Sequence, residues 1–201
     1  MRRLPAIVIP WWLALLTVAC ATPPSRFYQL SAASQPTAAP ASPAPASALS
    51  VAVGPVAIPA AIDRPQVVVT VGPNQVWLDE FNRWAGPVQN EIARVVAENL
   101  VAMLGTPRVT LFPQTLAVGA DFRAAIEVQR FESALGDAAT LDAVWTVSRT
   151  KDGRGTTGRT TVREPVQDKS YDALVAAHSR AVGRLSRDIA DAVQALDRSA
   201  L

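Results

Sequence analysis

The stretch SYDALVAAHSRAVGRLSRDIADAVQAL, residues 170–196, decides the fold class of this 201-residue chain. Its apolar residues recur at steps of three and four, the spacing that places side chains on one face of a helix. Ser170 is positioned to cap the first turn. The apolar stripe consists of Tyr171, Leu174, His178, Val182, Leu185, Ile189, Val193 and Leu196. We therefore predict one long amphipathic helix whose apolar face packs on a sheet.

A second helix and several strands are predicted ahead of this one. Residues 87–104 carry an apolar face, begin at Pro87 and end before Gly105, which suit a helix start and stop. Alternating or β-branched runs predict strands at residues 50–59, 66–71, 75–78, 109–112, 122–131, 141–148 and 156–163. Strands, helix, strands, helix predicts an α+β fold, with an antiparallel-rich sheet and two amphipathic helices packed on one face.

The N-terminus has the layout of a secretory signal peptide. Arg2 and Arg3 precede a short apolar segment that is too short to span a bilayer and ends at Cys20, the single cysteine. The run Leu16–Cys20 resembles the lipobox of bacterial lipoproteins, although Thr17 stands where leucine is usual. The resemblance implies that residues 1–19 are removed and that Cys20 is acylated. The alternative is a plain signal peptide, which would leave a lone thiol in an oxidising compartment.

The predicted organisation has three parts: a signal peptide at 1–19, an acylated N-terminus with an Ala/Pro-rich linker at 20–49, and a single domain at 50–201. The island Phe27–Leu30 leaves two alternatives. Residues 31–49 either form a tether, which spans roughly 60 Å when extended, or a long loop that lets the island pair back into the sheet. In the lipoprotein system that the lipobox resembles, an aspartate after the cysteine retains the protein in the inner membrane. Ala21 in that place indicates the outer membrane, on the periplasmic face.

Composition and residue types argue against several function classes. Removing Arg2 and Arg3 leaves 17 basic and 17 acidic residues, so the mature chain is near neutral and nucleic acid is not an expected partner. His178 is the only histidine, and its place on the apolar stripe indicates a structural residue rather than a catalytic base. One histidine without a free cysteine cannot form a metal site of several ligands. We expect no catalytic residues, no metal, no cofactor and no enzymatic activity.

Three surface segments are candidates for partner binding, each with a plain structural alternative. The loop Asp63-Arg64-Pro65-Gln66 either closes on itself through an Asp–Arg contact or presents Arg64 to a partner or a lipid head group. Phe81, Arg83 and Trp84 either pack on the first helix or form a partner-facing patch. The hairpin at 149–163 is either a solvated turn or a contact for anionic lipid or an acidic partner, through Arg149, Lys151, Arg154, Arg159 and Arg163.

Three runs carry a resemblance to a known family, and that resemblance extends over essentially all of the mature chain. Val53–Pro59 (VGPVAIP), Ile62–Val68 (IDRPQVV) and Arg83–Val88 (RWAGPV) resemble the PqiC-like auxiliary lipoproteins of ABC-type transport systems. Gly86 departs from the acidic residue that is common there, and the long Ala/Pro-rich linker is a second departure.

The resemblance implies a periplasmic accessory lipoprotein of an MCE/ABC-type intermembrane lipid transport system. Its partners would be an MCE-domain protein, whose tube it docks at the outer membrane, and that membrane itself through acyl chains. A closed homo-oligomeric ring would match the symmetry of such a tube. The residues that we expect to bind the partner are Asp63, Arg64, Gln66, Arg83, Trp84, Lys151 and Arg154. The alternative is a structural or assembly lipoprotein of the cell envelope without a role in lipid transport.

Overall fold

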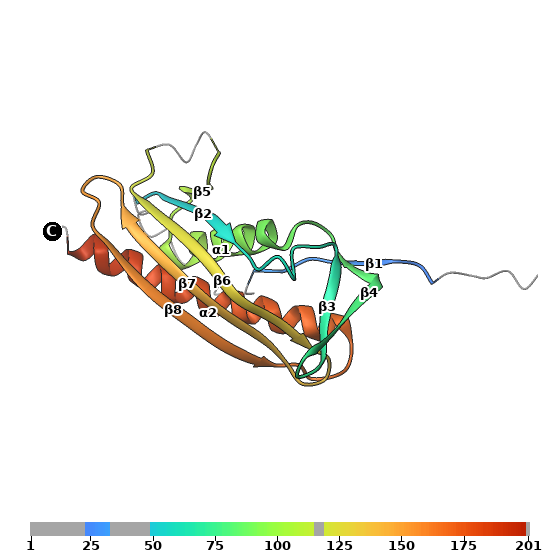
Figure 1. Cartoon of the computed structure of the whole chain (residues 1–201). Helices are drawn as coiled ribbons and strands as arrows, with labels where there is room; N and C mark the ends of the chain where they lie inside the picture. The colour runs from blue at the N-terminus through green and yellow to red at the C-terminus, as the bar shows by residue number, and fades with distance from the viewer. Residues whose placement is uncertain (1–22, 33–48, 115–118, 200–201) are drawn as a thin grey trace, which may run out of the picture.

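The computed structural model describes residues 23–32, 49–114 and 119–199. Its elements follow in the order β1 (Arg26–Tyr28), β2 (Val51–Ala57), β3 (Gln66–Gly72), β4 (Gln75–Trp84), α1 (Val88–Leu104), β5 (Val109–Leu111), β6 (Phe122–Ala134), β7 (Ala138–Arg149), β8 (Gly155–Pro165) and α2 (Tyr171–Arg198). The predicted α+β class is confirmed (Figure 1).

The described strands form two sheets rather than one. The larger sheet has the order β5-β2-β6-β7-β8, and the smaller has the order β1-β4-β3. The longest pairs are antiparallel, as predicted, because β6, β7 and β8 follow one another through short turns. Both sheets are nevertheless mixed, since β2 runs parallel to β5 and β6, and β1 runs parallel to β4.

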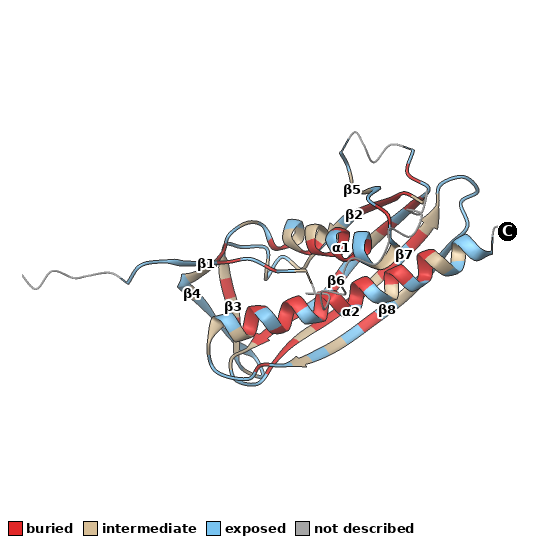
Figure 2. Ribbon diagram, turned by 180° about the vertical axis from the view of Figure 1, so that it is seen from behind, coloured by how far each residue is buried: buried red, intermediate tan, exposed pale blue. Residues whose placement is uncertain are grey.

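Both helices cover the same face of the five-stranded sheet, as the sequence predicts (Figure 2). The stripe of α2 faces this sheet, and Leu185 and Ile189 are completely buried. The Oγ of Ser170 accepts a hydrogen bond from the backbone N–H of Ala173 at 3.1 Å, which confirms the predicted cap. α1 ends at Gly105, whose φ of 64° is the left-handed conformation that favours glycine at a helix end.

One predicted strand needs correction, and one residue of another strand is buried unusually deeply. The strand predicted at residues 75–78 continues to Trp84, because after a bulge Arg83 pairs with Gln66 of β3. Asp142, in the strand predicted at residues 141–148, is only 4% exposed. It lies on the outer face of the sheet and is covered by Arg159 of β8, whose Nε and Nη2 donate to its two carboxylate oxygens at 2.8 and 2.5 Å.

The start of the described chain is part of the fold. Arg26–Tyr28 pair with Asn82–Trp84 at the edge of the three-stranded sheet, and Leu30 is completely buried. Of the two alternatives for Phe27–Leu30, pairing back into a sheet is therefore correct. Chain that precedes residue 50 thus contributes a strand and a core residue to the fold.

Candidate functional site

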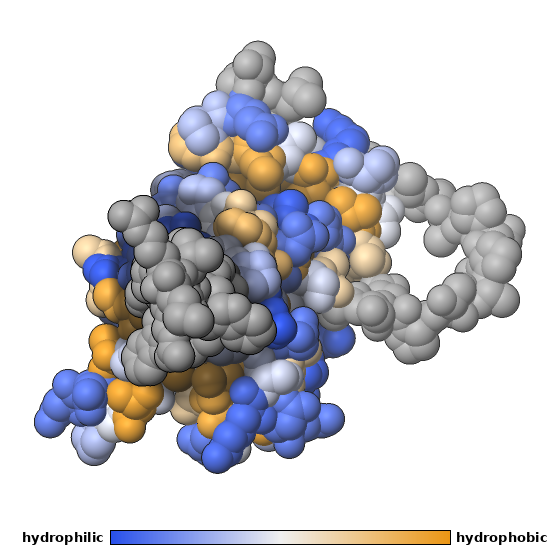
Figure 3. Space-filling view, turned by 90° about the vertical axis from the view of Figure 1, so that its right-hand side faces the viewer, coloured by the Kyte–Doolittle hydropathy of each residue, from blue (hydrophilic) through white to orange (hydrophobic). Residues whose placement is uncertain are grey.

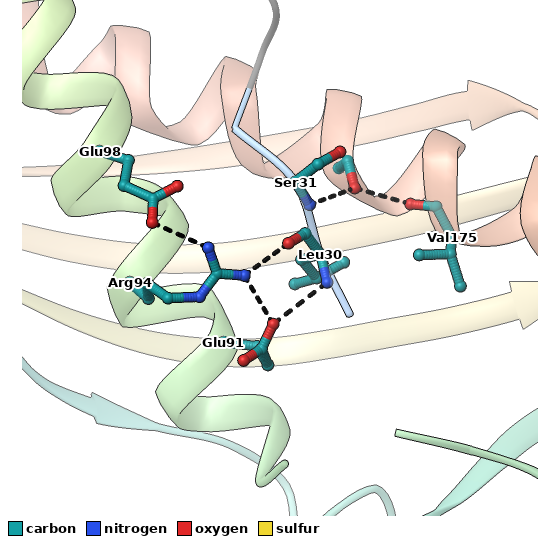
Figure 4. Close-up of polar contacts among 7 residues, drawn as sticks. Leu30, Ser31, Glu91, Arg94, Glu98 and Val175 are labelled. Atoms are coloured by element: carbon teal, nitrogen blue, oxygen red, sulfur yellow. Dashed lines mark hydrogen bonds and ion pairs between the residues drawn. The ribbon is translucent and has the colours of Figure 1, made fainter. Parts of the chain in front are cut away.

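The segment that follows β1 is held between the two helices (Figure 4). The Leu30 carbonyl accepts a hydrogen bond from Nη2 of Arg94 at 2.5 Å, and the Leu30 N–H donates to Oε2 of Glu91 at 3.2 Å. Arg94 is itself oriented by Glu91 and Glu98, at 2.7 and 2.8 Å. On the α2 side, the Ser31 N–H donates to Oγ of Ser179 at 3.1 Å. Side chains from both helices thus fix the backbone of Leu30–Ser31.

A second group of contacts fixes β1 against β4 and α2. The carboxylate of Asp79 accepts hydrogen bonds from the N–H groups of Phe81 and Asn82 and from the Tyr171 hydroxyl, the last at 2.6 Å. The Tyr28 hydroxyl donates to Asn82 at 2.9 Å. Burial raises the pKa of the Asp79 carboxyl, but these hydrogen bonds outweigh it and hold the pKa below its usual range. Burial and the Asp79 contact raise the pKa of Tyr171, so its hydroxyl stays a donor.

β-pairing brings two of the predicted candidate segments together. Gln66 lies opposite Arg83, and the Trp84 N–H donates to the Pro65 carbonyl at 2.7 Å. The side chains of Asp63 and Arg64 are exposed and make no ion pair with any described residue, so the internal Asp–Arg contact is absent there. Gln66 reaches across to Glu80 at 3.2 Å. An exposed loop and the end of β4 thus form one surface.

Trp84 belongs to the core and not to this surface. It is 6% exposed, and its ring lies 6.1 Å from that of Phe131 and 6.3 Å from that of His178, centroid to centroid. Trp84 therefore packs in the core, where its ring contacts lie on β6 and α2 rather than on the predicted first helix, and its side chain is not available to a partner. Arg83 next to it is half-buried, and its Nε has no hydrogen-bond partner in the described chain.

Hydrophobic residues are exposed mainly on the three-stranded sheet. Of the seven exposed large hydrophobic residues in the described ranges, six lie on this sheet and the seventh is Val101 of α1. The six are Phe27, Val71, Val76, Trp77, Leu78 and Phe81. Figure 3 looks onto this end of the molecule and shows hydrophobic side chains among hydrophilic ones.

Of these six residues, only Phe81 is a candidate surface residue on the sequence patterns described above. The signal for three of the others is the consecutive run Val76-Trp77-Leu78, because successive strand residues face opposite sides of a sheet. Such a run places apolar side chains on both faces, and one of these faces meets water unless a second layer covers it. The run therefore marks an unusual surface even without a structure.

The second predicted surface lies at the opposite end of the molecule. The turn between β7 and β8 carries Lys151 and Arg154, and Figure 1 places it at the far end from β1. Its basic charge is largely compensated: Asp152 pairs with Arg149 at 3.3 Å and with Arg154 at 3.8 Å. Along β8, Arg159 and Arg163 pair with aspartates, each at 2.5 Å. Lys151 makes no ion pair with the described residues, so it is the uncompensated cation of this turn.

His178 is the structural residue that its position on the stripe predicts. It is completely buried, stacks on Phe131 with ring centroids 3.9 Å apart, and its Nε2 lies 2.8 Å from the Ser133 hydroxyl. Burial lowers its pKa to about 3, so the ring is neutral at physiological pH. Ser133 is also buried, so neither member of this pair is exposed to solvent. In the described part of the chain, no group of three or more His, Cys, Asp or Glu residues is arranged to hold a metal ion.

The acylation candidate Cys20 lies outside the described residues, three positions before Pro23. Within the described ranges, neither helix is both long and apolar enough to cross a membrane.

Comparisons with known proteins agree with this architecture. A family model described as "ABC-type transport auxiliary lipoprotein component" matches residues 28–190. Protein XCC0632 from Xanthomonas campestris is similar in structure, with a TM-score of 0.67 and 20% identity, over 88% of this chain and all of that one. The crystal structure of an uncharacterized protein has a TM-score of 0.66 and 19% identity, over 84% of this chain and 98% of that one. At these identities the two structures support the fold alone. No curated protein matches the chain.

Proposed function

Because the chain belongs to the family of ABC-type transport auxiliary lipoproteins, we propose that it is a non-enzymatic accessory lipoprotein of an MCE/ABC-type intermembrane lipid transport system. Acyl chains on Cys20 hold it in the outer membrane, facing the periplasm. The domain docks the transport tube of an MCE-domain partner at that membrane.

The observation that carries this proposal is that residues 26–31 are fixed in the domain by the pairing of β1 with β4 and by hydrogen bonds to both helices. We call these contacts the clamp. If the fold began at residue 50, a flexible linker of 30 residues would separate it from Cys20, with a mean span of about 30 Å. Instead β1 and Leu30 are built into the domain, and only a few residues lie between Cys20 and Arg26. A short connection restricts the height and orientation of the domain above the membrane. Such restriction raises the effective concentration of a docking surface for a tube that arrives there.

The position of β1 shows which predicted partner surface lies nearer to the anchor and which lies farther from it. The anchor end lies at β1, and the β7–β8 turn lies at the other end (Figure 1). A tube that approaches from the inner membrane meets this distal turn first. We assign the main contact to the exposed side chains of Lys151 and Arg154, and a flanking contact to Arg64 in the loop before β3.

Charge reversal tests the docking role. We expect the double variant Lys151→Glu, Arg154→Glu to lower recovery of the MCE partner in a pull-down several-fold, and Arg64→Glu to lower it less. The loss should shrink at high salt, because exposed charges are screened. Arg187→Glu, an exposed arginine on α2 away from both loops, is the matched control and should bind like wild type.

Each outcome has a defined meaning. Melting curves of all variants should match that of the wild-type chain, since the substituted side chains are exposed. If the wild-type chain recovers an MCE-domain protein but both variants bind equally well, the docking surface is elsewhere. If the wild-type chain recovers no such protein, the alternative of a structural lipoprotein is favoured.

A further inference from the structure

We propose that the β3–β4 hairpin is a membrane-binding element, which inserts Val71, Val76, Trp77 and Leu78 into the interfacial region of the bilayer that holds the lipid anchor. The inference rests on the Cys20 anchor of the proposed function and adds a second contact with the same lipid surface.

The hairpin has the composition of a lipid-contacting segment. Residues 66–78 contain no charged side chain, although Val71, Val76 and Trp77 are each more than half exposed. A surface hairpin of a soluble domain ordinarily carries charged residues at such positions, which protect exposed strands from aggregation. Charged side chains are costly at membrane depth, whereas aliphatic side chains and tryptophan are favoured at the membrane interface.

Both faces of the hairpin are apolar near its turn. Trp77 pairs with Val69 and shares its face, whereas Val76 and Leu78 pair with Thr70 and Val68 on the opposite face. A protein partner or a second copy that packs on one face of a sheet would leave the other face in water. A lipid interface surrounds an inserted hairpin and contacts both faces, so this pattern favours lipid over a flat protein surface.

The chain between Cys20 and Pro23 is short enough to keep the anchor near the hairpin. Pro23 and Pro24 lie in a groove beside Asp79 and Phe81 of β4. Pro23 follows Cys20 by three positions, which limits the distance between them to roughly 11 Å. Trp77 lies two residues before Asp79 on the same strand, about 7 Å away. The acylated residue is therefore confined to the neighbourhood of the exposed apolar side chains.

Further residues at this end fit the same orientation. Phe27 of β1 and Phe81 of β4 are exposed beside the point where the chain leaves toward Cys20. Charged residues begin at the base of the hairpin, with Asp79 and Glu80, and Arg26 lies on the neighbouring strand. An uncharged hairpin with exposed apolar side chains above a charged base matches the change from acyl chains to head groups and water.

Tryptophan fluorescence can test the insertion directly. Of the tryptophans that follow Cys20, Trp84 and Trp145 are buried and Trp77 is 61% exposed. The mature, acylated chain is reconstituted into vesicles of equal parts phosphatidylethanolamine and phosphatidylglycerol, with and without bromine on the acyl chains. We expect brominated lipid to quench part of the emission, and Trp77→Phe to abolish that part. Aqueous acrylamide should quench Trp77 at least twofold less in vesicles than in detergent-free solution of the unacylated domain.

Two charged variants provide the matched comparison. Leu78→Asp should lower quenching by brominated lipid at least twofold, because a carboxylate resists transfer into the interface. Val101→Asp, which changes the exposed hydrophobic residue of α1, should leave the quenching unchanged. Flotation of the vesicles reports the Cys20 anchor separately, and all variants should float.

The outcomes separate the two proposals. If the protein floats with the vesicles but Trp77 is quenched by acrylamide and not by brominated lipid, the hairpin inference is wrong and the anchor at Cys20 still holds. Protection of Trp77 from both quenchers would show that protein covers the hairpin, which also overturns the inference. Failure to float would overturn the anchor, and with it this inference.

Discussion

The two sheets of this protein differ in what covers them. Two helices cover one face of the five-stranded sheet, and polar partners such as Arg159 and Asp142 occupy the other. The three-stranded sheet packs Val67 and Val69 into the core. Its other apolar residues, above all Val76 and Trp77, remain exposed. Folding alone does not require the exposed apolar surface of the smaller sheet, so a function outside the domain is the better explanation for it.

The largest expected effect comes from placing the same charge in each region. Leu185 of α2 is completely buried against the large sheet, so Leu185→Asp leaves an unpaired charge in the core and should cost about 4 kcal/mol or more of the free energy of unfolding. Leu78→Asp should change it by less than about 0.5 kcal/mol, as surface substitutions do. Chemical denaturation of both variants measures the difference. Equal losses would mean that the small sheet is as essential to the core as the large one.

His178 connects the two sheets, because its ring packs against Trp84 of β4 and Phe131 of β6. Burial lowers the pKa of His178 to about 3. Below pH 6.5, His178 therefore binds a proton in the unfolded chain but not in the folded chain. Stability should therefore fall as pH falls, by about 1.4 kcal/mol per pH unit, which amounts to about 2 kcal/mol at pH 5.

His178→Gln removes this titration and keeps a group that can hydrogen-bond to Ser133. Denaturation curves between pH 8 and pH 5, expressed as wild type minus variant, isolate the contribution of the histidine from that of the carboxylates. A difference that is independent of pH would show that the imidazole is hydrated in the folded protein.

A smaller effect is expected at the clamp that joins the N-terminal segment to the helices. Arg94→Met removes the donor to the Leu30 carbonyl and should cost about 1 kcal/mol, because the side chain is partly exposed. Arg130→Met breaks the exposed pair with Glu132 and should leave the free energy of unfolding nearly unchanged, because solvent screens an exposed pair.

Amide hydrogen exchange gives the more specific readout of this clamp. Residues 26–31 should exchange faster in Arg94→Met but not in Arg130→Met. Unchanged exchange in Arg94→Met would mean that β-pairing with β4 alone holds the segment.

Local patterns correctly predicted much of the secondary structure. The stripe from Tyr171 to Leu196 and its cap at Ser170 were recognisable because helix periodicity and capping involve residues only a few positions apart. The same holds for the hairpin at residues 149–163, which joins β7 to β8. The family membership was also predictable, from the runs at 53–59, 62–68 and 83–88.

Other features were decided only by the tertiary structure. The parallel pairing of β1 with β4 joins residues 56 positions apart, and the bond from Arg94 to Leu30 spans 64. No periodicity encodes such pairs, because their formation depends on the whole core that brings the strands together. Local sequence patterns were therefore enough to locate most helices and strands and to identify Cys20 as the anchor candidate. Tertiary packing decided that the chain after Cys20 is clamped beside an uncharged, exposed hairpin, because only long-range contacts choose which apolar side chains are covered and which stay in water.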